Sequence, residues 1–70
     1  MTKKEMYENA LKNYELSEKE FLRIYALRDN NDGEYHKEKK KLSERQAAGF
    51  VHIVVAYRQY LRSIGKLTSN

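Results

Sequence analysis

The sequence predicts an all-α fold, a small bundle of three or four helices. Three observations support this prediction: the 70-residue chain has no Pro, has only three Gly, and repeats a helix-start motif at three places. Lys, Glu, Leu and Ala are also common, and these residues favour helix. We expect helices at about residues 3–15, 18–28, 34–41 and 44–64. The sequence leaves open whether the last two form one continuous helix.

The repeated motif has the form of a capping box and occurs at residues 2–5, 17–20 and 43–46. In such a box, a Ser or Thr hydroxyl accepts from the backbone N–H three residues on, and a Glu or Gln there reaches back. Leu16 and Phe21 add the spacing of a hydrophobic staple around the second motif, which makes this start the firmest. The third motif has only an alanine in the staple position, so the break there stays open.

Apolar residues at helical spacing define the inner faces of the first two helices. They are Tyr7, Ala10, Leu11 and Tyr14 in the first, and Phe21, Leu22, Tyr25 and Ala26 in the second, with Ile24 to one side. Leu16 falls off the first stripe, which indicates a bend just before Ser17.

The third helix has a looser start after the turn-rich stretch RDNND, with Asn31 followed three residues later by Glu34. It continues as HKEKKK and has almost no apolar residue apart from Tyr35. We therefore expect this helix to project into water.

The last helix is the most apolar part of the chain. Its apolar residues cover about half of the circumference and are Ala47, Phe50, Val51, Ile53, Val54, Tyr57, Tyr60, Leu61 and Ile64, with Ala48 and Val55 widening the arc. A surface helix shows an arc of roughly 100°, so an arc this wide is typical of a helix covered on two sides. The first two helices supply one cover, and a second copy of the chain is the expected other. Gly65 supplies the stop.

Length and composition set the limits of the protein. A chain of 70 residues forms one domain with a thin core, which we expect to span 1–70 with a frayed tail at 65–70. It has no Cys, which excludes disulfides and thiolate zinc sites. The N-terminus lacks the apolar region of a signal peptide, and no apolar run approaches the roughly 20 residues of a membrane span. We expect a cytoplasmic protein that does not enter the membrane.

No stretch carries catalytic or ligand chemistry of useful specificity. His36 and His52 lack partners at metal-ligand spacing, because Glu34 and Glu38 lie two residues from His36 and so diverge from it on a helix. An EF-hand alignment of the RDNND turn places cations where key carboxylates belong. Nucleophile motifs and phosphate-binding Gly loops are lacking as well. We expect a non-enzymatic protein without metal, cofactor or small-molecule substrate.

The wide apolar arc favours an interaction protein that docks a helix face on a protein partner, with a homodimer as the expected form. Aromatic residues and Arg are enriched at interfaces. The candidate interface residues are Tyr57, Arg58, Tyr60, Leu61, Arg62 and Ile64.

The alternative partner is nucleic acid. A net charge of +4 and a compact cationic segment suit contact with phosphates. The segment consists of Lys37, Lys39, Lys40, Lys41 and Arg45, and acidic residues dilute it. The short Lys/Glu/Asn-rich composition would suit a regulatory or accessory protein of a bacterium or bacteriophage.

Overall fold

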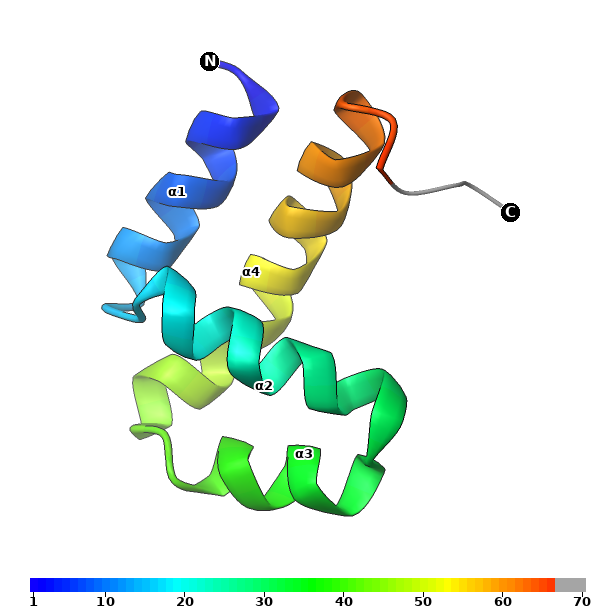
Figure 1. Ribbon diagram of the computed structural model, residues 1–70. Coiled ribbons are helices and arrows are strands. Elements are labelled where there is room, and N and C mark those ends of the chain that lie inside the picture. Colours follow the sequence, from blue (N-terminus) through cyan, green and yellow to red (C-terminus); the bar gives the residue numbers. More distant parts are fainter. Residues whose placement is uncertain (67–70) are drawn as a thin grey trace.

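The computed structural model describes residues 1–66, which contain the four helices α1 (Lys3–Asn13), α2 (Glu18–Asn30), α3 (Asp32–Lys40) and α4 (Glu44–Ser63) (Figure 1). No strand occurs in this part of the chain, so the all-α prediction is confirmed. α1 and α4 lie alongside each other in opposite directions, and α2 and α3 form a second antiparallel pair (Figure 1). Residues 67–70 of the expected frayed tail lie outside the described residues.

α1 ends two residues earlier than expected because a left-handed turn closes it. Glu15 has φ 55°, a conformation that is uncommon for residues other than Gly. The N–H of Leu16 donates to the carbonyl of Leu11 over 3.0 Å, and the N–H of Glu15 donates to that of Lys12 over 3.1 Å. These two bonds define a Schellman turn. α4 closes in the same way at Gly65, which has φ 74° and acts as the predicted stop.

A single extended residue, Asn31, separates α2 from α3, so both helices reach two residues further into the turn than expected. Its backbone N–H donates to the carbonyl of Leu27 over 2.7 Å and closes α2. Its side chain accepts from the N–H of Glu34 over 3.2 Å and opens α3. The turn is shorter than its polar sequence indicates because Asn31 serves both helices. Its side chain caps the start of α3, and its backbone closes the end of α2.

The chain breaks at Ser43, so α3 and α4 are two helices. The Ser43 hydroxyl accepts from the N–H of Gln46, and the Gln46 side chain accepts from the N–H of Ser43, each over 3.2 Å. At Ser17 only the first of these two bonds forms, because the Glu20 carboxylate binds Arg23 instead. Of these two motifs, the one at Ser43 forms the complete capping box, although its hydrophobic staple is the weaker one.

α3 does not project into water, and that expectation is wrong. It lies along α2, and its Tyr35 is only 8% exposed. The Tyr35 ring packs against the ring of Phe50 in α4, with a centroid distance of 5.8 Å. Tyr35 is thus the one buried residue of this helix, whose other side chains are mostly charged.

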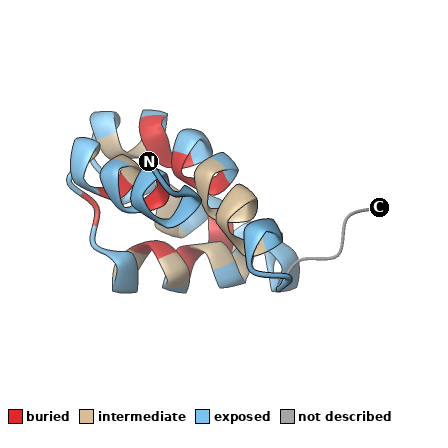
Figure 2. Ribbon diagram, turned by 90° about the horizontal axis from the view of Figure 1, so that it is seen from above, coloured by how far each residue is buried: buried red, intermediate tan, exposed pale blue. Residues whose placement is uncertain are grey.

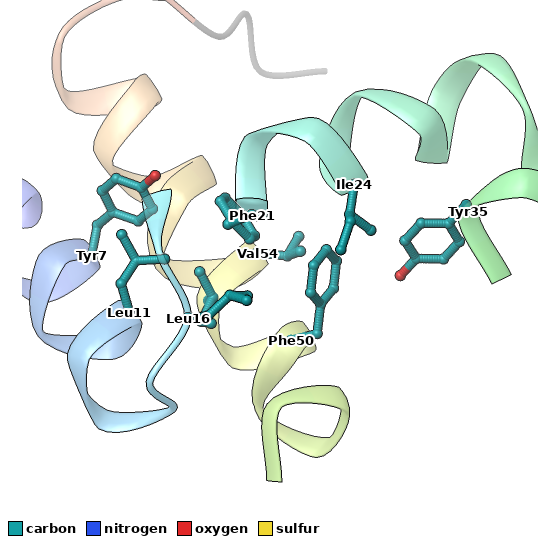
Figure 3. Packing of buried hydrophobic residues seen from close by; sticks show 9 residues of the cluster. Tyr7, Leu11, Leu16, Phe21, Ile24, Tyr35, Phe50 and Val54 are labelled. Atoms are coloured by element: carbon teal, nitrogen blue, oxygen red, sulfur yellow. The ribbon is translucent and has the colours of Figure 1, made fainter. Parts of the chain in front are cut away.

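The core is built around Phe21, which is fully buried (Figure 3). Its ring lies 5.9 Å from that of Tyr7 in α1, and 5.3 and 5.5 Å from those of Phe50 and Tyr57 in α4. Each helix contributes at least one buried residue, and most of its other positions are exposed or half-buried (Figure 2). Tertiary packing thus stabilises α1, α2 and α3, which have 11, 13 and 9 residues and would be marginal as isolated helices.

Two polar side chains at the start of α4 bind the end of α1. The guanidinium of Arg45 donates to the carbonyl of Asn13 over 2.7 and 3.2 Å. The amide of Gln46 donates to the carbonyl of Glu15 over 2.7 Å. These bonds satisfy carbonyls at and just beyond the C-terminus of α1, where a helix leaves carbonyls without intrahelical partners.

α1 and α4 meet closely at Gly49, which is buried in the middle of α4. A Cβ at this position would overlap the ring of Tyr14, which also stacks on His52 with a centroid distance of 6.0 Å. The Tyr14 ring therefore occupies the space that a side chain at position 49 would need.

We expect Gly49→Ala to destabilise the protein by about 1–3 kcal/mol, the usual effect of overpacking. Without the contact, the same change would stabilise the helix by about 1 kcal/mol. Urea unfolding measures the difference, and Tyr14→Ala is the background that removes the ring. In that background Gly49→Ala becomes neutral or stabilising, whereas equal destabilisation in both backgrounds would show that Tyr14 is not the cause.

A cluster of charges joins α2 to α3. The Glu38 carboxylate pairs with Arg23 over 2.7 Å and with Lys41 over 2.8 Å. Hydrogen bonds from Lys41 and from Arg23 hold the pKa of the Glu38 carboxyl below its usual range. A lowered pKa means that the folded protein binds a proton here less readily than the unfolded chain does.

The contribution of Glu38 to stability is therefore present above about pH 4.3, the ordinary pKa of a glutamate, and is lost as the pH falls through the lower folded value. We expect Glu38→Gln to lower the free energy of unfolding at pH 7 and to flatten its decline toward acid. Urea unfolding from pH 7 down to acid measures both effects. Glu8→Gln, on the exposed surface of α1, is the control, and an equal flattening by it would contradict the assignment.

Candidate interaction surface

α4 has one buried face and one exposed face, and both carry apolar residues. Phe50 and Ile53 are fully buried and Val54 is 7% exposed, so this face forms the core. Val51 and Val55 lie beside this buried face, on the flank next to Val54, and remain 56% and 51% exposed. Residues 1–66 thus cover one side of the wide apolar arc and leave the other side open.

The exposed valines belong to a longer row of side chains along α4, here named the outer stripe. Its members recur at alternating spacings of four and three residues and are Glu44, Ala48, Val51, Val55, Arg58 and Arg62. This is the spacing of a seam by which one helix packs along another. The outer stripe has an apolar centre and charged ends.

The two ends of the outer stripe carry opposite charge. Glu44 lies in the first turn of α4 and Arg62 in the last, and both are exposed. Within residues 1–66 neither side chain forms an ion pair or a side-chain hydrogen bond. Arg58 is half-buried and donates to the hydroxyl of Tyr25 over 3.2 Å, so its head group leans toward α2.

The predicted interface residues Tyr57 and Tyr60 lie in the aromatic cluster between the helices. Tyr60 stacks on Tyr7 with a centroid distance of 5.9 Å, and Tyr57 meets Tyr25 edge-on at 5.1 Å. Burial raises the pKa of the Tyr57 hydroxyl above its usual value. Both rings are half-buried and serve the fold.

The other predicted interface residues lie toward the end of α4. Leu61 is half-buried, Arg62 is exposed, and Ile64 is 49% exposed just beyond the helix. In the sequence, Val51 lies within the apolar arc, and Ala48 and Val55 widen that arc. The alternating spacing of the outer stripe was the signal that could have singled these residues out.

The structure divides the cationic segment between two helices. α3 ends at Lys40, so Arg45 lies on α4 and binds the end of α1. Lys41 pairs with Glu38, and the Lys39 ammonium lies 5.7 Å from the centroid of the Tyr35 ring and 5.9 Å from that of Phe50. Lys37 and Lys40 remain exposed, with no such contact among residues 1–66.

Other features of the described residues offer no clear site. No three His, Asp or Glu side chains among residues 1–66 come together in a way that could hold a metal ion. An open hollow on α1 is lined by Glu5, Glu8, Asn9 and Lys12, all from one helix. None of the four helices in residues 1–66 is long and apolar enough to span a bilayer.

Comparisons with protein families, with curated proteins and with solved structures find no match to this chain, so its function is inferred from its own residues.

Proposed function

We propose that the protein is a non-enzymatic interaction protein that docks a protein partner through the outer stripe of α4. The observation that supports this proposal is the exposure of Val51 and Val55 on a helix that already buries Phe50, Ile53 and Val54 in the core. Scattered exposed apolar residues are ordinary, but here they line up at the spacing of a helix-packing seam.

Burial of these side chains supplies a driving force. Burying a valine side chain completely is worth about 1.5–3 kcal/mol, so covering the two half-exposed valines would contribute on the order of 2 kcal/mol. The charged ends suit the polar rim that surrounds an apolar interface centre. The docking surface is thus centred on Val51 and Val55 in place of Tyr57 and Tyr60, and it keeps Arg58 and Arg62 at one end.

Photo-crosslinking tests the proposed surface directly. We expect p-benzoylphenylalanine at position 51 or 55 to form crosslinked species in cells that carry the protein, because a docked partner would cover these positions. The same group at position 8 on α1 is the control. Val55→Glu should abolish the crosslink from position 51. Equal crosslinking from positions 8 and 51 would contradict the proposal.

Nucleic-acid binding through the cationic segment remains the alternative function, and salt dependence separates the two. The logarithm of the binding constant falls linearly with the logarithm of the salt concentration, and each phosphate contact adds about −0.9 to the slope. With Lys37 and Lys40 as the exposed cations, we expect a slope no steeper than about −2 for duplex DNA. Fluorescence polarisation at several salt concentrations measures it. A slope of about −4.5, as expected if all five cations act, would favour the alternative.

A further inference from the structure

We infer that the partner of the outer stripe is a second copy of this chain, docked antiparallel about a two-fold axis level with Ile53. This inference rests on the proposed function and names the partner for that surface. It follows from the order of residues along the outer stripe. When a second copy of the stripe runs in the opposite direction, each residue meets one of compatible charge or size.

The charges at the two ends select the direction. Glu44 lies nine residues before Ile53 and Arg62 nine residues after it, which is about 13.5 Å along the helix on either side. An antiparallel copy therefore places each Glu44 opposite Arg62 of the second copy, and symmetry forms this pair twice. A parallel copy would place Glu44 opposite Glu44 and Arg62 opposite Arg62, which opposes association.

The apolar centre matches in the same register. Val51 of one copy faces Val55 of the other, again twice, so four valines meet at the axis. Ala48 faces Arg58, and the small alanine leaves room for the aliphatic stem of the arginine. One register thus pairs every member of the outer stripe with a compatible residue.

A seam of this size predicts weak association. Interfaces below about 1,200 Å² in total are those of transient complexes, and a single helix pair with small side chains belongs to that group. The end charges are exposed, so they contribute more to direction and register than to strength. We expect dimers to form between about 10 µM and about 500 µM protein.

Sedimentation equilibrium on the full chain tests the register through charge reversal. The mass should rise with concentration from 8.4 kDa toward twice that value. Glu44→Arg or Arg62→Glu alone should weaken dimerisation by about tenfold or more, because each creates two like-charged pairs. The double variant restores opposite charges in the antiparallel register and should regain dimerisation. An equimolar mixture of the two single variants should also dimerise more tightly than either alone.

Matched variants separate the outer stripe from general charge effects. Glu8→Arg and Lys12→Glu make the same charge changes on the exposed surface of α1 and should leave dimerisation unchanged. Val55→Glu should abolish it, and the milder Val55→Ser should weaken it. Circular dichroism confirms that each variant is folded before its mass is interpreted.

Three outcomes would overturn the inference. They are a monomer at about 500 µM, a dimer indifferent to Val55→Glu, and a double charge reversal that does not regain dimerisation. If the chain is monomeric while position 51 still crosslinks to another protein, the second-copy inference fails and the proposed docking function stands. If crosslinking at position 51 also fails to exceed that at position 8, both fail.

Discussion

The rings that pack around Phe21 determine how the rest of the molecule is arranged. A 70-residue chain has a thin core, and aromatic residues bury the most area for each position used. Tyr7 brings α1 to this centre, while Phe50 and Tyr57 bring α4. Once Phe50 points inward, the helical period turns the two valines of the outer stripe toward solvent. The exposed surface is therefore a consequence of the core.

Polar side chains at the end of α3 and the start of α4 also hold the helices together. Arg45 and Gln46 bind carbonyls at the end of α1, and Lys39 lies over the rings that dock α3. Cations that look free in the sequence therefore serve the fold. For this reason the cationic segment offers less charge to a nucleic acid than its composition indicates.

The features that depend on neighbouring residues were predictable, and those that depend on tertiary contacts were not. The caps at Thr2 and Ser17 and the stop at Gly65 are local, and all three form. The break at Ser43, which the sequence leaves open, forms as well. The direction in which α4 turns its wide apolar arc depends on which rings meet Phe21, and the sequence does not encode that choice locally. Tyr57 is an interface candidate in the sequence, and in the structure its half-buried ring packs against Phe21 of the core.

The charges of the outer stripe can be explained within a single helix. The evidence for a partner therefore depends on the two valines. An acid in the first turn and a base in the last both suit the helix dipole, so Glu44 and Arg62 would be favourable in a monomer. Any helix that follows this preference is complementary to an antiparallel copy of itself. The charges alone therefore select a direction and do not indicate that contact occurs. The indication comes from Val51 and Val55, because exposed apolar side chains at the centre of the row gain nothing from the dipole and gain burial only when a partner covers them.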